Sequence, residues 1–307
     1  MFKQIKSVLK KFMPPPTDVF NREINRSIKH SEKQTKIIAD LVKQSDKQMS
    51  EQLKLMKDEN KKLAVRLAEM EKKMNILQKG LTNCKGYASE IVWAEIFNNA
   101  ISDSTWLHNT AFSAGRWAVG YPYLYVMYRV LNEIRPKRIL ELGLGQSTRM
   151  LGQYTMAKEN VTHLVVEHDP EWIAFFKRDF ALSERSRIIQ LDREMERYKE
   201  ASEVRVFKGF AEQFKNEKFD FISIDAPLGA DMKQYSRIDV LKILPDCLAD
   251  DFVIMIDDSQ RPGETQTVKE MTNKLENSGI AYKTGKYAGN KECTIICSEN
   301  LKFACSM

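Results

Sequence analysis

The stretch RILELGLGQST runs from Arg138 to Thr148 and joins an apolar run to two closely spaced glycines. A short apolar run of this kind predicts a buried β-strand, so Glu141 inside it is not there for solubility. Gly143 and Gly145 permit a sharp turn and let backbone N–H groups approach a ligand closely. The stretch therefore predicts a strand that ends at a ligand-binding turn.

Two residues narrow the type of ligand. Thr148 stands where a dinucleotide-binding fingerprint has a third Gly or Ala, which argues against a bound pyrophosphate. Glu141 brings a negative charge to the turn, and an opposite charge within a few ångströms is favourable in a partly buried site. A ligand that lacks phosphates and carries positive charge is therefore expected.

Further apolar runs of strand length follow, and helical patterns alternate with them. The predicted strands are KRILELG (137–143), THLVVEHD (162–169), RIIQLD (187–192), FDFISIDAP (219–227) and DFVIMIDD (251–258). The predicted helices are Ser89–Ile101, Tyr121–Ile134, Thr148–Lys158, Glu171–Leu182, Asp231–Leu244 and Glu264–Asn277. At the end, IAYKTGKY (280–287) and ECTIICS (292–298) predict an antiparallel hairpin. This alternation indicates an α/β fold with a doubly wound sheet.

Acidic residues stand at the ends of these strands, where a doubly wound sheet binds its ligands. Glu167 lies 24 residues after Gly143, close to the spacing at which an acid accepts hydrogen bonds from both hydroxyls of a ribose. Asp225 ends the fourth run, and Asp257 and Asp258 end the fifth. Three converging carboxylates repel one another unless something positive joins them, and a divalent metal is the simple candidate.

The motif ELGLG at 141–145, the acid Glu167 and IDAP at 224–227 together resemble the class I S-adenosylmethionine-dependent methyltransferases, over residues 115–300. The resemblance implies S-adenosylmethionine as cofactor. It also implies a Rossmann-like, doubly wound sheet of seven strands in the order 3-2-1-4-5-7-6, with strand 7 antiparallel. The cofactor-binding residues carried over are Glu141, Gly143 and Gly145 for the methionine half, Ser147 beside them, Glu167 for the ribose, and Asp192 for the adenine amino group. For Asp192 an alternative to the adenine contact remains, because the sequence DREMER can also begin a solvated helix.

The acids after the fourth and fifth strands resemble those of metal-dependent O-methyltransferases of the catechol and caffeoyl-coenzyme A type, in which magnesium orients a substrate hydroxyl. That resemblance implies Mg²⁺ or Mn²⁺ held by Asp225, Asp257 and Asp258, with Asp225 and Asp257 as catalytic residues. Two positions differ. The group usually has Asp-Asn at 257–258, and Asp-Lys where this chain has Pro227-Leu228.

The expected acceptor is a hydroxyl group, because a carboxylate at Asp225 suits deprotonation of an alcohol. Methyltransferases that act on the amino groups of bases have Asn/Asp-Pro-Pro-aromatic at this point, whereas DAPL at 225–228 has no such ring. IDAPLG is also similar to plant glucuronoxylan O-methyltransferases, so a saccharide or surface-glycan precursor is the acceptor expected from the resemblance. Arg237 and Arg261 follow these strands and either meet an acidic acceptor or lie at the surface. Trp106, His108, Trp117, Tyr121 and Tyr123 either form a lid or pack in the core.

A long stretch without Pro or Gly precedes the α/β part. Its residues Leu53, Met56, Asn60, Leu63, Leu67, Met70, Met74 and Leu77 are spaced 3-4-3-4-3-4-3, as on the a/d seam of a coiled coil. Asn60 at an a position can pair with its own copy, and Arg66 can pair with Glu71 between helices. Upstream the repeat is weaker. Residues 20–80 are therefore expected to form a parallel homodimeric coiled coil, with a trimer or a solvated single helix as alternatives.

The first 19 residues form a basic amphipathic segment. Residues 2–12 can lie on an anionic membrane surface, and the alternative is a frayed terminus or a small docking helix. Residues 1–80 contain 19 Lys/Arg and 10 Asp/Glu, whereas residues 81–307 contain 29 and 32. Because the expected methyltransferase domain, 81–307, is near neutral, no nucleic-acid partner is expected.

The remaining features favour a cytoplasmic protein, with contact at the membrane surface left open. There is no run of about 18 apolar residues that could span a bilayer, and the N-terminus does not have the pattern of a secretory signal. The five cysteines form no CxxC pair, so neither a zinc site nor a disulfide framework is suggested. Two alternatives to the enzyme remain: a coiled-coil scaffold with a Rossmann-like head that binds a ligand or partner without catalysis, and an RNA methyltransferase that grips RNA through its basic N-terminal part.

Overall fold

The computed structural model describes residues 17–307, and the chain divides into two compact units, Met1–Gln78 and Lys79–Met307. The proposed membrane contact of residues 2–12 lies outside the described residues, as does most of the basic segment 1–19.

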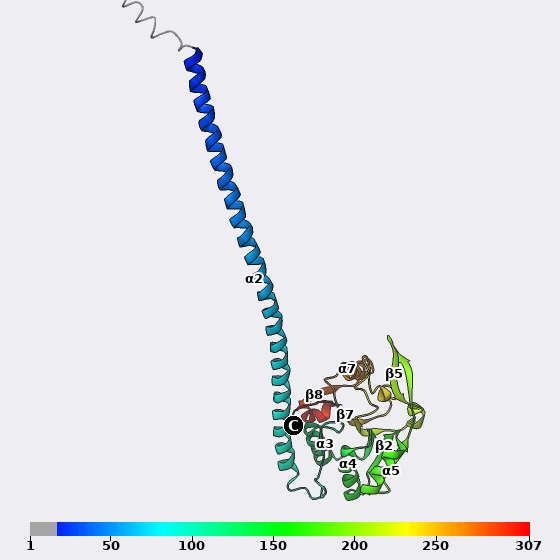
Figure 1. The fold of residues 1–307 in the computed structure, drawn as a ribbon. Helices are drawn as coiled ribbons and strands as arrows, with labels where there is room; N and C mark the ends of the chain where they lie inside the picture. Colours follow the sequence, from blue (N-terminus) through cyan, green and yellow to red (C-terminus); the bar gives the residue numbers. More distant parts are fainter. Residues whose placement is uncertain (1–16) are drawn as a thin grey trace, which may run out of the picture. The chain divides into compact units, whose positions relative to one another are not determined.

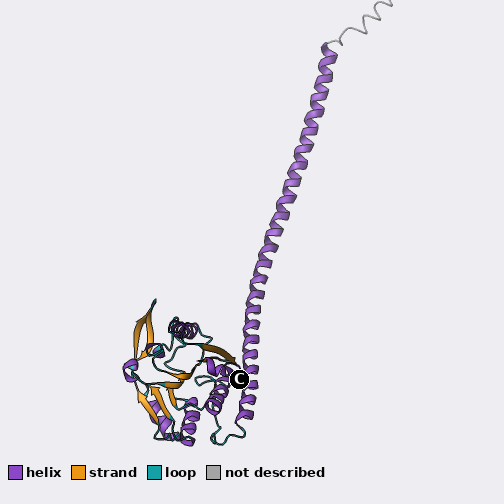
Figure 2. Ribbon diagram, turned by 180° about the vertical axis from the view of Figure 1, so that it is seen from behind, coloured by secondary structure: helices purple, strands orange, loops and turns teal. Residues whose placement is uncertain are grey.

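The second unit is built around a seven-stranded sheet (Figure 1, Figure 2). Its strands are β1 (Arg138–Leu142), β2 (Thr162–Glu167), β3 (Ser186–Gln190), β6 (Phe219–Ile224), β7 (Leu248–Ile256), β8 (Tyr282–Ala288) and β9 (Glu292–Ser298). They lie in the order β3-β2-β1-β6-β7-β9-β8, with β9 antiparallel to both neighbours. The predicted order 3-2-1-4-5-7-6 with an antiparallel seventh strand is confirmed.

The sheet separates two apolar cores because successive residues of a strand point to opposite faces. Leu140 and Leu142 of β1 belong to one core, and Ile139 belongs to the other. All three side chains are fully buried, and each such burial stabilises the fold by roughly 1.5–3 kcal/mol. A central parallel strand covered on both faces is apolar almost throughout, which makes the charged Glu141 in its middle exceptional.

Helices cover both faces of the sheet. They are α3 (Tyr121–Arg129), η1 (Val130–Ile134), α4 (Gln146–Ala157), α5 (Pro170–Asp179), α6 (Phe210–Gln213), η2 (Asp239–Lys242), α7 (Pro262–Asn277) and η3 (Glu299–Ser306). Leu124 of α3 and Leu151 of α4 pack in the core of Ile139, whereas Leu275 of α7 packs in the core of Leu140. The helices predicted near α3, α4, α5 and α7 are thereby confirmed.

Two segments differ from the prediction. The helix predicted at Asp231–Leu244 is wrong: a loop occupies most of it, followed by the short 3-10 helix η2. Tyr235 and Arg237 in this loop have φ angles of 46° and 59°, which a right-handed helix excludes. The DREMER sequence forms no helix either, because β4 (Arg193–Tyr198) pairs with β5 (Ala201–Phe207) in a separate two-stranded antiparallel sheet.

The helix α2 extends over Thr17–Ile101, beyond the end predicted at residue 80. Its side chains from residue 17 to residue 85 are all exposed, and those of the predicted seam range from Leu53, 50% exposed, to Leu77, 71% exposed. The helix is confirmed, whereas its pairing in a coiled coil stays a prediction. Among residues 17–307, none of the helices has the length and apolar character needed to cross a membrane.

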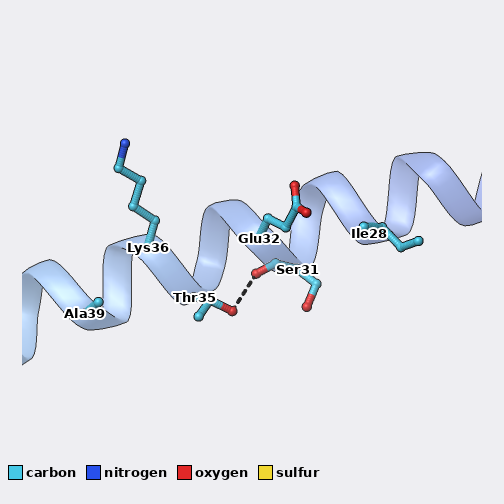
Figure 3. Close-up of a pocket in the computed structure, with 6 residues that line it drawn as sticks. All are labelled: Ile28, Ser31, Glu32, Thr35, Lys36 and Ala39. Atoms are coloured by element: carbon cyan, nitrogen blue, oxygen red, sulfur yellow. Dashed lines mark hydrogen bonds between the residues drawn. The ribbon is translucent and has the colours of Figure 1, made fainter.

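Figure 3 shows six side chains on one stretch in the N-terminal part of α2. A shallow hollow there is lined by Ile28, Ser31, Glu32, Thr35, Lys36 and Ala39. The Thr35 hydroxyl donates to the Ser31 carbonyl oxygen at 2.8 Å, so it is satisfied within the helix. Because all six side chains come from one helix, the hollow is a strip of helix surface with no enclosing wall.

Candidate active site

The glycine turn after β1 lies directly against the end of β6. Gly143 has a φ of 105°, and a Cβ placed on it would lie 3.1 Å from the Cβ of Ala226. Glycine adopts such a conformation at no steric cost. The Gly143 N–H donates to the Val166 carbonyl oxygen and the Asp225 N–H donates to the Leu142 carbonyl oxygen, both at 2.9 Å. The turn and Asp225 are therefore held side by side.

The second glycine of the turn faces open space. A Cβ on Gly145 would meet no atom within 4 Å, so a ligand can approach the backbone here. The Gly145 N–H donates to the Thr148 hydroxyl at 2.8 Å, and α4 begins at the next residue. Ser147 is buried in the first turn of α4. The free N–H groups of that turn and the positive end of the helix dipole favour a carboxylate at this point.

Glu167 ends β2 and turns its carboxylate back toward the glycine turn. Its Oε2 accepts from the Leu144 N–H at 3.2 Å, and its Oε1 accepts from the N–H groups of His168 and Asp169 at 2.7 and 3.1 Å. The Nδ1 of His168 also lies 2.7 Å from Oε1. A carboxylate has about four lone-pair positions, so Oε2 can still accept one hydrogen bond. The ribose contact stays a prediction, and this arrangement allows it through Oε2.

Glu141 is fully buried on the same face of the sheet as Ile139. Its Oε2 lies 3.0 Å from Nε2 of His163, whose Nδ1 lies 3.3 Å from the Ser186 hydroxyl. Among the described residues, its Oε1 has no hydrogen-bond partner. The predicted contact of Glu141 with the methionine half of the cofactor stays a prediction and depends on Oε1.

Asp192 lies in the link between β3 and β4 and is exposed. Its carbonyl oxygen accepts from the Lys208 N–H at 2.8 Å, which ties this link to the residue after β5. The exposed carboxylate is accessible to a ligand. Its role with the adenine amino group stays a prediction.

The three acids predicted to converge do lie together, with one carboxylate oxygen of each within 4.8 Å of the others. Asp225 follows β6, whereas Asp257 and Asp258 follow β7, and these two strands are neighbours in the sheet. Asp257 and Asp258 are 1% and 2% exposed, whereas the Asp225 side chain is 18% exposed. Asp225 is therefore the member of the group that a substrate can reach.

Two buried cations lie among these acids. Nη2 of Arg237 lies 3.1 Å from Oδ1 of Asp225 and 3.1 Å from Oδ2 of Asp258. Nζ of Lys291 lies 3.1 Å from Oδ2 of Asp257 and 3.5 Å from Oδ1 of Asp258. The repulsion expected among the three carboxylates is thus relieved by protein side chains, because an opposite charge this close favours the ionised form.

Arg261 and Glu264 complete this group, which we call the acid–base cluster: Asp225, Arg237, Asp257, Asp258, Arg261, Glu264 and Lys291. Nη1 of Arg261 lies 2.8 Å from Oδ2 of Asp258 and 3.6 Å from Oε1 of Glu264. Glu264 is fully buried and lies 3.8 Å from Nε of Arg237. With four acids and three bases, the cluster has a net charge of −1 when every group is ionised.

Burial has the largest influence on the titration of the cluster. It raises the pKa of Asp225 to about 8 against the attraction of Arg237, and it raises the pKa of Asp257 against the attraction of Lys291. For Arg237 and Lys291, burial lowers the pKa, but the attraction of the surrounding acids outweighs it and raises the pKa overall. The two cations are therefore charged at neutral pH, whereas Asp225 is largely protonated there.

The backbone of the cluster is strained at two non-glycine residues. Arg237 and Asp258 have φ angles of 59° and 58°, in the left-handed region. Each such residue costs on the order of 1–2 kcal/mol and persists only where its surroundings hold it. Strain of this kind gathers at functional sites, which supports the assignment of this cluster as one.

Lys291 and Glu264 were not predicted as site residues, and Arg237 was left between two roles. Lys291 lies in the turn between β8 and β9, directly before β9. Because β9 is antiparallel to β7 and pairs Thr294 with Ile256, the start of β9 lies at the carboxyl end of β7. The predicted topology therefore contained the signal: a charged residue just before the antiparallel strand falls at the site.

The aromatic residues before β1 divide between core and surface. Trp106 and Tyr123 are 4% and 1% exposed and belong to the core, whereas Trp117 is 82% exposed. The neighbouring Ala118 carbonyl oxygen accepts from Nζ of Lys291 at 2.8 Å. The exposed indole of Trp117 is therefore next to a residue that contacts the cluster.

No family model and no curated protein matches this chain. Among solved structures, the chain is similar to an O-methyltransferase from Bacillus cereus in complex with SAH, at 14% identity and a TM-score of 0.42, covering 69% of this chain and 90% of that one. It is also similar to the O-methyltransferase TomG from Streptomyces achromogenes in complex with SAM, at 14% identity and a TM-score of 0.44. This similarity covers 68% of this chain and 98% of TomG. A spermidine synthase from Thermotoga maritima is similar at 14% identity and a TM-score of 0.34, covering 57% and 59%.

Proposed function

We propose that residues 79–307 form an S-adenosylmethionine-dependent methyltransferase that acts on a hydroxyl group. One observation carries the proposal: the glycine turn, open at Gly145, lies directly against the Asp225–Ala226 end of β6. A cofactor bound at Gly145, at the first turn of α4 and at Glu167 is then adjacent to the one carboxylate of the cluster that a substrate can reach.

The chain's own residues supply binding, alignment and a base. When bound, S-adenosylmethionine supplies a methyl group on a positively charged sulfur, which is already activated for displacement. Ionised Asp225 accepts the proton of the attacking hydroxyl, and because its pKa is about 8, the ionised fraction grows as the pH rises from about 7 to about 9. Arg237, at 3.1 Å from Oδ1, fixes the orientation of that carboxylate.

We propose a role for Asp257 that differs from the catalytic role expected from the resemblance. Its side chain is 1% exposed and is held by Lys291, so no substrate touches it. We therefore propose Asp257 as a residue that positions Lys291, and we retain Asp225 as the proposed catalytic residue.

We further propose a saccharide or a surface-glycan precursor as the acceptor. The similarity of IDAPLG to enzymes that act on sugar acids supports this class. A second support is Trp117, which directly precedes the Ala118 that contacts Lys291, because an exposed indole offers a flat apolar face with a polar edge to a sugar ring.

We also propose that the seam of α2 pairs with a second copy of the chain in a parallel coiled coil. The support is a run of eight a/d positions, seven of them apolar, along a helix whose side chains are all exposed from residue 17 to residue 85. An apolar stripe of this length on a single helix is covered by association in water. A dimer is the proposed state, and a trimer is the alternative.

Calorimetric titration of the full chain with S-adenosylmethionine and with S-adenosylhomocysteine tests the cofactor site. Gly145→Val places a side chain in the open space, so we expect the affinity to fall at least tenfold, about 1.4 kcal/mol or more. Because nothing lies within 4 Å of the added Cβ, the melting temperature should change by less than about 3 °C.

Gly80→Val is the matched control, since its Cβ also meets nothing within 4 Å, at a place far along the sequence from the turn. Equal affinity in wild type and Gly145→Val would show that the turn is not the binding site. A wild-type chain that binds neither compound would contradict the proposed enzyme and favour the scaffold alternative.

A further inference from the structure

The acid–base cluster has the carboxylates of a metal site, but protein cations already lie between them. Nζ of Lys291 already lies between two of these carboxylates, 3.1 Å from Oδ2 of Asp257 and 3.5 Å from Oδ1 of Asp258, where a divalent metal shared by them would be expected. A metal bridging Asp225 and Asp258 would meet Arg237 Nη2, which lies 3.1 Å from each. As they are placed, the residues present do not fit a divalent metal.

Lys291 is built into this position. Its turn is anchored to α2 within the second unit, because the Ala288 carbonyl oxygen accepts from the Ser89 hydroxyl and from Nε1 of Trp93, both at 2.9 Å. The Asn290 N–H donates to Oε2 of Glu90 at 2.8 Å. The ammonium donates to the Ala118 carbonyl oxygen, and the Lys291 side chain as a whole is 11% exposed. It is therefore held among the acids from several sides.

Charge balance points the same way. Even with every group ionised, the cluster has a net charge of only −1, so a bound divalent ion would bring this buried group to a net charge of +1. Mg²⁺ also requires oxygen ligands at about 2.0–2.1 Å in near-octahedral geometry. An ion that close to Asp257 and Asp258 would lie against the ammonium of Lys291, and like charges in a buried site are unfavourable.

We propose that Arg237 and Lys291 take the place of a divalent metal in this site, so that the protein works without one. Lys291 is then a positioning residue: it holds Asp257 and Asp258 together and leaves Asp225 free for the substrate. The role of Lys291 in catalysis rests on the proposed function. The replacement of a divalent metal by Arg237 and Lys291 does not depend on that function, because it concerns metal binding by the free protein.

The test is a titration of full-length protein with Mn²⁺, after treatment with EDTA and its removal, followed by the electron paramagnetic resonance signal of free Mn²⁺. We expect the wild type to bind no Mn²⁺ at this site below about 1 mM. Lys291→Met keeps the apolar stem and removes the ammonium that Asp257 and Asp258 share, while Asp258 keeps Arg237 and Arg261. We expect this variant to bind one Mn²⁺ at least tenfold more tightly than the wild type.

Lys286→Met is the matched control, because Lys286 lies on the same hairpin, is 61% exposed and pairs with Glu292 outside the cluster. It should behave as the wild type does. Lys291→Gln is a second variant in case Lys291→Met does not fold, since its amide can still donate to the Ala118 carbonyl oxygen.

One equivalent of Mn²⁺ bound by the wild type in the micromolar range would overturn the proposal. It would equally be overturned if neither Lys291 variant gained Mn²⁺ binding. The Mn²⁺ titration contains no S-adenosylmethionine and no acceptor. A failure of the proposed function would instead appear as absent cofactor binding in the calorimetric titration.

Discussion

At the scale of single residues, Asp239 shows how one buried carboxylate links stability to pH. It is fully buried, and its Oδ1 accepts from the Phe207 N–H at 2.7 Å. Among the described residues its Oδ2 has no partner. Burial raises its pKa to about 7, although Lys242 lowers it. Because the folded-state pKa lies above the unfolded value, the folded protein binds the extra proton. Stability is then lost as the pH rises from about 4 to about 7.

Asp239→Asn should remove this loss. Asparagine keeps the acceptor for the Phe207 N–H and cannot ionise, so the variant should gain up to roughly 4 kcal/mol over the wild type at pH 8. At pH 4 the two proteins should differ little. Urea unfolding at both pH values measures the difference, and an unchanged gap between them would contradict a raised pKa at Asp239.

The site residues differ in how far they could be predicted. The acids Glu167, Asp225 and Asp257 follow apolar runs, and the rule that ligands bind at the carboxyl ends of parallel strands brings such acids to one edge. Their cationic partners follow no local pattern. Arg237 reaches the cluster from a left-handed backbone position, and Lys291 reaches it from a hairpin, so both depend on tertiary contacts that no short stretch encodes.

At the scale of elements, the seam of α2 can be tested against the opposite side of the same helix. Leu67 is at an a position and Val65 is at an f position, and both are about as exposed as each other, at 62% and 60%. In a parallel dimer Leu67 is buried in both copies, whereas Val65 stays in water.

Leu67→Lys should weaken the dimer by about 3 kcal/mol or more, roughly a hundredfold in dissociation constant, because two buried leucines are replaced by two facing charges. Val65→Lys should change the dissociation constant of the dimer by less than about threefold. Sedimentation equilibrium of the full-length variants gives both values. Equal effects of the two substitutions, or a wild type that stays monomeric at high concentration, would count against the coiled coil.

The segment Asp231–Leu244, which was predicted to be helical and is mostly a loop, shows that tertiary contacts can outweigh a local pattern. The segment has helical spacing of apolar residues, yet burying Arg237 among Asp225, Asp258 and Glu264 requires a left-handed turn. The buried ion pairs lie outside any window used to read periodicity. β4 and β5 were missed for a related reason, since a two-stranded sheet in which four of the six residues of β4 are charged gives a weak strand signal.

At the scale of the whole molecule, the second unit contains all the apolar cores of the described residues. A fragment of residues 79–307 should therefore fold alone and keep the affinity of the full chain for S-adenosylmethionine within about twofold. It should be monomeric, because the seam from Leu53 to Leu77 is missing.

Light scattering and calorimetry on the fragment and the full chain provide the comparison. A fragment that remained dimeric would show that self-association does not depend on the seam of α2. The fragment should also fail to bind RNA, because its charged residues nearly balance; appreciable RNA binding would favour the nucleic-acid alternative.

The strands of the seven-stranded sheet were predictable because each central strand is an almost unbroken apolar run and the closing hairpin is bounded by a clear turn, whereas their order was implied by the family resemblance. The helix of residues 20–80 was predictable from composition and spacing, but its continuation to Ile101 was not, since Gly80 and the change of composition after it indicate a boundary.

The insertion of β9 between β7 and β8 has a consequence for synthesis on the ribosome. β9 is the last of the strands to be made, yet it fills an interior place in the sheet, so a nascent chain without it exposes the apolar edge of β7 from Phe252 to Ile256. Such an edge invites aggregation. Lys291 directly precedes β9 and emerges with it, so the sheet is closed and the acids gain their ammonium in the same late step.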